Sequence, residues 1–423
     1  MSNRVFITGL SALTAAGANA DDTWRAILDK KTGLGEMKTW DVSSWPCKLG
    51  GELKDFQPAN LLPDRKLLKV ISRQDVMGIH AAIKAVEHSQ FIQYRDTLTS
   101  TETFNDATAV YVGSPGNKFY QQYDFLPLVA KTDGDMQPFA NQLFDEVHPM
   151  WLLRILPNNV LAYTGMTYGF KGINQNIANH AVSGTQAIIE AYHAIKNGQA
   201  ERAVVVAYDV ALEPQGLYYY DKLGVISHRH LKPFDTEHDG TLLSEGAGAL
   251  VLESEASVNA RHAKCYAEII GGQSATETVG LFSIEAGGEQ LANLLKNTLD
   301  QSNLLPSDIG LMVAHGNGNQ KSDVSEAAAI TSVFGECALP VTAFKWAIGH
   351  TACASGVLDA VFTAFALREK CVPGIANLQQ LAPDCQAIDA TACHRELSSG
   401  AYAMMINRGF ASMNACLVMK ACE

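Results

Sequence analysis

The chain has no hydrophobic run of the roughly 18 residues that a helix needs to cross a bilayer. It also has no excess of basic residues. The net charge is −12, which argues against a nucleic-acid-binding protein, because such proteins carry basic faces. The nine cysteines show no spacing typical of a disulfide framework or a zinc site. We therefore expect a cytoplasmic protein with no membrane span, no metal and no cofactor.

The length and the alternation of apolar runs predict an α/β protein of two halves. The 423 residues exceed the roughly 250–300 residues that a single hydrophobic core usually serves. Apolar runs at 109–112, 203–207, 249–252 and 309–314 predict strands that are buried on both faces. Residues 5–7 precede a Thr-Gly turn, which favours a strand over a signal peptide. Helical stretches separate the runs, and no Pro- or Gly-rich linker divides the chain.

A helix is predicted at 183–197, because Ala187, Ala191 and Ile195 recur at helical spacing. Ser183 is its expected N-cap, and Gly198 is expected to end it. Ala181 therefore precedes a helix N-terminus, the position at which free N–H groups stabilise a thiolate nucleophile. By contrast, residues 115–160 show weak periodicity and many aromatic residues, which predicts a cap or an insertion.

Short segments spread along the chain carry a family resemblance. They are VFITG at 5–9, YGFKG at 168–172, NIANHAVSGTQAI at 176–188, PFDTEHDG at 233–240, EGAG at 245–248, AHGNGN at 314–319, the pair Lys345 and His350, and NRGFASMN at 407–414. In this order they resemble the motifs of the β-ketoacyl-ACP synthases, or condensing enzymes. The resemblance implies a thiolase-type αβαβα layered fold of two similar halves, residues 1–255 and 256–423.

The resemblance also implies an active site that lacks its nucleophile. The family has a cysteine where this chain has Ala181. His315 and His350 would polarise a malonyl thioester carbonyl and stabilise the enolate. Lys345 would supply a fixed charge and pair with Glu326, although that ion pair could equally serve only to hold the halves together.

Other residues of the same pocket depart from the family pattern. Arg408 stands where the family has its gating phenylalanine, within a gate segment that also contains Phe410. His180 could act as a polar group in the empty pocket or point away from it. Phe119 and Tyr123, in the predicted cap, could limit the length of the acyl tunnel.

Two further features invite a functional interpretation. Cys353 lies in a nucleophile-like segment, but it follows His350 in the wrong half, so a packing role is favoured. Acyl carrier proteins are usually acidic, so a docking site would be a local basic cluster. The candidates are Arg202, His228, Arg229, His230 and Lys232, and the alternative for each of them is a solvated loop.

The favoured function is a chain-length-factor-like subunit. Such a subunit would pair with an active ketosynthase in a heterodimer and shape the acyl tunnel of fatty acid or polyketide-type elongation, with an acyl carrier protein as a further partner. An aryl polyene or type II polyketide pathway would suit it. The alternatives are a malonyl-ACP decarboxylase, an active 3-oxoacyl-ACP synthase with an engineered Cys→Ala change at 181, and a plain scaffold.

Overall fold

Within the residues that the structure describes, one continuous sheet of 11 strands forms the frame of the molecule, and it contains two five-stranded sections with the same strand order, called the first and the second sheet below. The computed structural model describes residues 4–116, 124–335, 339–398 and 401–422. The first sheet has the order β5 (Asn174–Ile177), β4 (Thr108–Gly113), β6 (Arg202–Val210), β7 (Glu245–Ser254), β1 (Val5–Thr14). The second has the order β10 (Pro340–Thr342), β9 (Ile309–Val313), β14 (Tyr402–Gly409), β15 (Met413–Ala421), β8 (Ala267–Thr276).

The two sheets also share their strand directions, so the halves are structurally similar. In each sheet the first three strands are parallel and the last two are antiparallel to their neighbours. The halves join where β1 pairs with β8, from Val5 opposite Ile269 to Ile7 opposite Ala267. The strand β12 (Asp389–Ala390) extends the outer edge of the second sheet. Short pairs are formed by β2 (Gly35–Glu36) with β3 (Leu49–Gly50) and by β11 (Cys371–Val372) with β13 (Arg395–Glu396).

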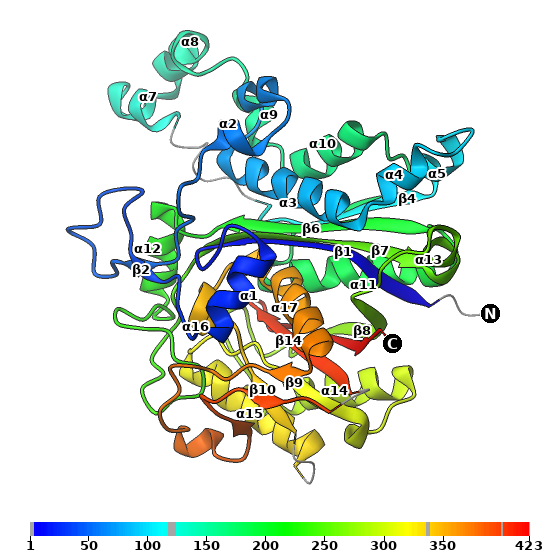
Figure 1. Ribbon diagram of the computed structural model, residues 1–423. Coiled ribbons are helices and arrows are strands. Elements are labelled where there is room, and N and C mark those ends of the chain that lie inside the picture. The colour runs from blue at the N-terminus through cyan, green and yellow to red at the C-terminus, as the bar shows by residue number, and fades with distance from the viewer. Residues whose placement is uncertain (1–3, 117–123, 336–338, 399–400, 423) are drawn as a thin grey trace.

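Helices fill the space between the sheets and cover their outer faces, which gives five layers (Figure 1). The central layer contains α11 (Ser183–Lys196) and α17 (Ser355–Glu369), with α1 (Ala20–Leu28) and α16 (Lys345–Ile348) beside them. The first sheet is covered by α3 (Arg73–Ser89), α4 (Phe91–Arg95), α5 (Glu102–Asp106) and α10 (Asn159–Tyr168), and the second by α14 (Glu289–Ser302) and α15 (Gln320–Phe334). Among the described residues, the remaining α-helices are α2 (Pro58–Leu61), α7 (Leu126–Lys131), α8 (Met136–Glu146), α9 (Trp151–Ile155), α12 (Pro214–Lys222) and α13 (Glu255–Arg261). The αβαβα fold that the motifs implied is confirmed.

The strands predicted from continuous apolar runs are confirmed and buried on both faces. In β6, Val204 and Val206 pack in the cluster on the α3 side, whereas Val205 and Ala207 pack in the central cluster with α11. Every residue of β1, β4, β6 and β7 is buried. Apolar and polar residues do not alternate along these strands, because each face of the strand packs against a layer of helices. No helix of the described residues is long and apolar enough to cross a membrane.

The predicted helix after Ala181 is confirmed, but its N-cap prediction was wrong. Ser183 is the first helical residue of α11, and its hydroxyl donates to the carbonyl of His180 while accepting the N–H of Asn179. A three-residue 3₁₀ turn, His180–Val182, takes the place of an extended cap residue. The helix ends at Lys196, and Gly198, which follows the C-cap Asn197, adopts a φ of +71°, as the stop signal predicted.

The region predicted as a cap lies outside the layered body. Helices α7 and α8 project from the top of the molecule in Figure 1, and the described residues of α8 and α9 include no buried side chain. Phe119 and Tyr123, the proposed tunnel residues, lie outside the described residues. The boundary at 255/256 between the halves stays a prediction.

Candidate active site

The elbow turn brings an alanine to the centre of the fold. The strand β5 ends at Ile177, and the turn His180–Val182 leads into α11. Ala181 has no exposed surface. The gate segment lies against it, because a Cβ on Gly409 would come within 3.3 Å of the Ala181 nitrogen. A cysteine at this position would be stabilised as a thiolate by the N-terminus of α11. The methyl group of Ala181 has no nucleophilic atom.

The two predicted histidines lie together beneath the same pocket. The ring centroids of His315 and His350 are 5.2 Å apart and nearly perpendicular. The backbone N–H of Arg408 donates to Nδ1 of His315 at 3.2 Å, and that of Ala352 donates to Nδ1 of His350 at 3.3 Å. Each Nδ1 is therefore an acceptor, which leaves the proton on Nε2.

Both histidines are neutral hydrogen-bond donors at ordinary pH. Burial is the main cause that brings the pKa of His315 and of His350 well below the usual range, and the nearby Lys345 adds to it. Neutral imidazoles with Nε2–H groups can stabilise an oxyanion, as the resemblance implied. They cannot replace a nucleophile that must hold an acyl chain.

Lys345 is buried, but its predicted partner was wrong. Its ammonium group donates to the carbonyl of His315 at 2.7 Å and pairs with the carboxylate of Asp359 at 3.3 Å. The Asp359 carboxylate also accepts from the side chain of Asn407 at 2.8 Å. The lysine thus binds the backbone of His315 to α17, through an acid that sequence spacing did not single out.

Glu326 instead holds the loop that carries His315. Its carboxylate accepts the backbone N–H of His315 at 2.6 Å and that of Gly316 at 3.0 Å. Burial raises the pKa of Glu326 to about 7, against the lowering effect of Arg408 and of these hydrogen bonds. Glu326 is therefore a positioning residue for His315.

Arg408 is a fixed, buried part of the wall. Its guanidinium pairs with Glu277 at 2.5 Å and donates to the side chain of Asn414 at 3.0 Å and to the carbonyl of Ser322 at 3.0 Å. Only 6 % of the side chain is exposed. A residue held by so many partners cannot swing as a gate without breaking a buried ion pair.

A cluster of aromatic rings forms another part of the pocket wall. Phe410 stacks on His180 with centroids 4.5 Å apart and on Tyr220 at 5.4 Å, and Phe282 meets it edge-on at 5.3 Å. Nε2 of His180 lies 2.5 Å from the hydroxyl of Tyr220. His180 therefore points into the pocket, which settles its orientation.

These groups surround a cavity of about 370 Å³. Of the predicted residues, His180, His315, His350, Arg408 and Phe410 line it, whereas Ala181, Lys345 and Glu326 lie behind its wall. Sequence reasoning missed Tyr220, Glu277 and Asp359, because none of them lies in a quoted motif. Among the described residues, no group of three or more His, Cys, Asp or Glu side chains is placed to hold a metal ion.

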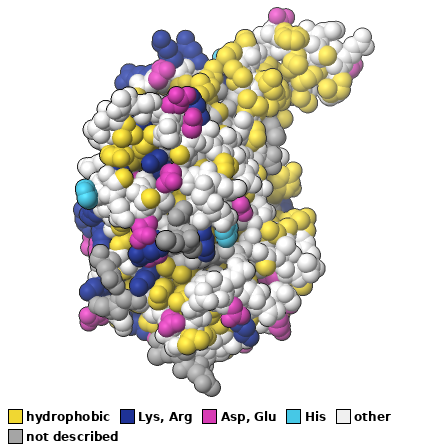
Figure 2. All heavy atoms as spheres, turned by 90° about the vertical axis from the view of Figure 1, so that its right-hand side faces the viewer, with side chains coloured by type: hydrophobic (Ala, Val, Ile, Leu, Met, Phe, Trp, Pro, Cys, Tyr) yellow, Lys and Arg dark blue, Asp and Glu magenta, His cyan; other side chains and the backbone are white. Residues whose placement is uncertain are grey.

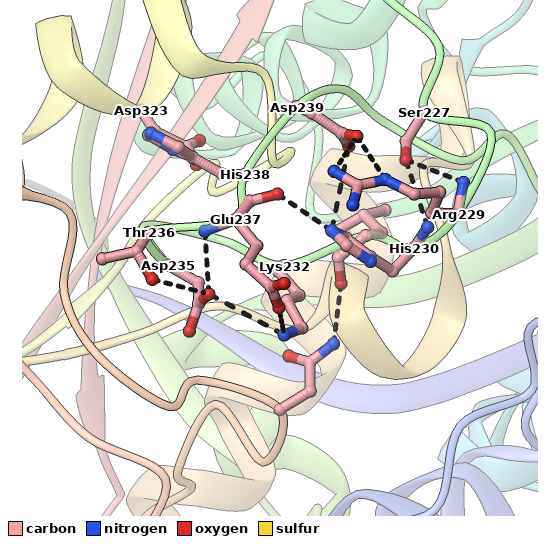
Figure 3. A network of polar contacts seen from close by, with 12 residues as sticks. Ser227, Arg229, His230, Lys232, Asp235, Thr236, Glu237, His238, Asp239 and Asp323 are labelled. Carbon is pink, nitrogen blue, oxygen red and sulfur yellow. Dashed lines mark hydrogen bonds and ion pairs between the residues drawn. The ribbon is translucent and has the colours of Figure 1, made fainter.

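The basic candidates for carrier docking do not form a positively charged patch (Figure 3). Arg229 pairs with Asp239 at 2.8 Å, and Lys232 pairs with Glu237. His230 contacts the carbonyl of Glu237 at 2.8 Å, and His228 pairs with Asp221 at 2.7 Å. Acids of the loop and of the neighbouring helix α12 thus offset these bases.

Arg202 does not belong to that loop at all. It begins β6, is buried, and lies 4.0 Å from the centroid of the Phe104 ring. Burial lowers its pKa. The prediction of Arg202 as a docking residue was wrong, because a carrier protein could not reach it, and the place where a carrier docks stays a prediction.

The sequence comparisons identify the family of the chain. The family model "Beta-ketoacyl synthase, N-terminal domain" matches residues 2–257, and "Beta-ketoacyl synthase, C-terminal domain" matches residues 266–379. The chain therefore belongs to the β-ketoacyl synthase family.

Its relatives include the 3-oxoacyl-[acyl-carrier-protein] synthase 2 of a Synechocystis strain, 28 % identical over 90 % of this chain and 89 % of the relative. The enzyme of the same name from Staphylococcus aureus (strain COL) is 27 % identical over 100 % of this chain and 99 % of the relative.

Solved structures share the fold along the whole chain. The ishigamide ketosynthase/chain length factor superposes with a TM-score of 0.88 at 20 % identity, with 100 % of both chains covered. A β-ketoacyl synthase from Burkholderia phymatum STM815 superposes with a TM-score of 0.87 at 24 % identity, again with 100 % of both chains covered. At these identities the likeness establishes the fold alone.

Proposed function

We propose that this member of the family is a chain-length-factor-like subunit. It would pair with an active β-ketoacyl-ACP synthase and shape the acyl tunnel of an aryl polyene or type II polyketide pathway. The observation that carries the proposal is the methyl group of Ala181, which lies without exposed surface at the elbow. Condensation needs a thiolate there to hold the growing chain as a thioester. Donors such as His315 and His350 stabilise charge but cannot carry that chain.

A projecting apolar surface supports pairing with another subunit. We call α7, α8 and α9 the arm. Its exposed side chains include Leu126, Met136, Phe144 and Leu152, and Phe144 is 91 % exposed. Figure 2 shows hydrophobic side chains gathered on the projection at the top of the molecule. Clustered exposed apolar side chains of this kind are typical of an interaction site.

Co-purification tests the proposal. This chain, with a tag, is co-expressed in turn with each ketosynthase of the source organism that has the elbow cysteine, and native mass spectrometry counts the subunits. We expect a one-to-one complex with one of them, and a change in the lengths of the acyl products when this chain is omitted. A chain that pairs with none of them, or whose omission leaves every product length unchanged, contradicts the proposal.

The histidine pair supports a second candidate, a malonyl-ACP decarboxylase. In that reaction the bond between the carboxylate carbon and the methylene carbon breaks and CO₂ leaves. The electron pair forms an enolate, whose oxygen the two Nε2–H groups would stabilise, and a proton from water then gives acetyl-ACP. Mass spectrometry of malonyl-ACP incubated with this chain alone tests it. Acetyl-ACP that disappears with His350→Ala supports decarboxylation, and unchanged malonyl-ACP rules it out.

A further inference from the structure

The backbone conformation of His180 directs its side chain toward the cavity. His180 has a φ of +51°, in the left-handed region that residues with a side chain adopt uncommonly. The turn to Ala181 and the stack on Phe410 hold the imidazole against the cavity. The family resemblance gives this residue no role.

The contacts of His180 determine where its proton lies. The backbone N–H of Phe410 points to Nδ1 at 3.4 Å, so Nδ1 is the acceptor. The ring proton is then on Nε2 and is donated to the hydroxyl oxygen of Tyr220 at 2.5 Å. Burial lowers the pKa of His180 to about 4, so the neutral form with this arrangement persists through neutral pH.

The hydroxyl proton of Tyr220 is consequently left for another acceptor. Within the described part of the chain, His180 is the one hydrogen-bond partner of this hydroxyl, and there the oxygen accepts. Tyr220 lines the same cavity as His315 and His350. Burial raises the pKa of Tyr220, so the phenol keeps its proton.

The buried charges around the cavity select a neutral acceptor. Arg408 is neutralised by Glu277, and His180, His315 and His350 are uncharged because burial lowers the pKa of each. His238 pairs with Asp323, and the remaining basic residue of the lining, Lys321, is exposed to solvent. A carboxylate would therefore find no buried, unpaired cation among the described residues of the wall. A carbonyl oxygen needs only a donated hydrogen bond and loses less hydration on entering the cavity.

We propose that Tyr220 is a binding residue whose hydroxyl, oriented by His180, donates a hydrogen bond to a carbonyl oxygen of an acyl group held without a covalent bond. His180 is its positioning residue. This inference rests on the proposed function only in taking a carrier-bound acyl group as the ligand. In a pocket without a thiol, the hydrogen bond from Tyr220 would hold the acyl group in place of a covalent thioester bond.

Binding of a stable ligand to the chain alone tests the proposal. The probe is acetoacetyl-pantetheine with an amide in place of the thioester, and isothermal titration gives its Kd. We expect Tyr220→Phe to raise the Kd by about three- to tenfold, the effect of one lost hydrogen bond. Tyr219→Phe is the matched control, because Tyr219 precedes it on α12 but is 52 % exposed and does not line the cavity. Pantetheine without the acyl group should bind both variants as it binds the native chain.

The positioning role of His180 needs a separate measurement. His180→Phe keeps a ring to stack on Phe410 but removes both nitrogens. We expect it to weaken acyl binding as Tyr220→Phe does, with no further loss in the double variant. In the native chain, the ¹⁵N resonances of His180 should have an unprotonated Nδ1 and a protonated Nε2.

Several outcomes would overturn the proposal. They are a native chain that does not bind the probe, a Tyr220→Phe variant that binds it as well as the native chain, and an equal loss of affinity for pantetheine alone. Unchanged thermal unfolding of Tyr220→Phe excludes misfolding as a cause. Because the test uses no ketosynthase, its failure is distinct from a failure of subunit pairing.

Discussion

The hydroxyl of Ser183 lies 3.8 Å from Sγ of Cys353, at the point where the first turns of α11 and α17 meet. The two helices begin alike, each after a three-residue 3₁₀ turn and each with a Ser-Gly pair. In this correspondence Cys353 of the second half matches Ala181 of the first. The thiol therefore occupies the equivalent elbow of the wrong half, where burial raises its pKa far above the usual range and leaves it unreactive.

This relationship predicts the effect of restoring a thiol. Ala181→Cys places the sulfur at the N-terminus of α11, which favours the thiolate. After incubation with hexanoyl-N-acetylcysteamine, intact mass spectrometry should find one hexanoyl group on Ala181→Cys and none on the native chain. Cys353→Ala in the same background should change nothing. Absence of the adduct would show that the elbow no longer admits a thioester.

The ion pair of Arg408 with Glu277 predicts a large stability effect. Arg408→Leu leaves a carboxylate buried without its cation, which costs about 3–5 kcal/mol of unfolding free energy. Adding Glu277→Gln should recover much of that loss. Arg4, whose side chain is 54 % exposed, provides the control, since Arg4→Ala should cost about 1 kcal/mol or less. Urea unfolding gives the unfolding free energy of all four proteins. Equal losses for Arg408→Leu and Arg4→Ala would contradict a stabilising role of the buried Arg408–Glu277 ion pair.

The raised pKa of Glu326 predicts that the unfolding free energy of the protein depends on pH. Its folded-state pKa is raised to about 7 by burial, so the folded protein keeps a proton that the unfolded chain releases above about 4.5. This contribution is present at low pH and is lost as the pH rises from about 4.5 through 7. Unfolding free energies at several pH values in this range should therefore fall more steeply for the native chain than for Glu326→Gln. Parallel curves would mean that the carboxyl group ionises normally.

The exposed position of the arm predicts that substitutions there weaken pairing with a ketosynthase without changing the stability of the single chain. Phe144→Ser and Leu152→Ser, made together, remove exposed apolar surface and leave the layered core untouched, so the thermal midpoint of the single chain should stay the same. Complex formation with a ketosynthase should fall at least tenfold. Asn141→Ser, an exposed polar change on the same helix α8, should preserve it. Normal pairing of the double variant would place the interface elsewhere.

The sequence predicted the layered fold because local signals and the global arrangement agree. Runs such as that of β6 are apolar on both faces since helices cover both. The positions of Ala181, His315 and His350 followed from their motifs.

The partners of the charged residues could not be predicted in the same way. Sequence spacing pointed to Glu326 as the partner of Lys345, whereas the packing of α17 places Asp359 at the ammonium group and Glu326 holds the backbone of His315 instead. Tyr220 approaches His180 from a helix 40 residues away, and nothing in its local sequence distinguishes it from the two tyrosines before it.

The position of β1 has a consequence for how the chain acquires its structure. This strand is made before its partners, yet it lies between β7 and β8, and the hydroxyl of Thr8 donates to Glu253, 245 residues further along. Contacts so distant in sequence form slowly, because the chain loses the entropy of a long loop before they stabilise it. During synthesis this apolar strand must wait until partners 245 residues further along are made, so we expect slow folding and a reliance on chaperones that shield this segment until its neighbours emerge.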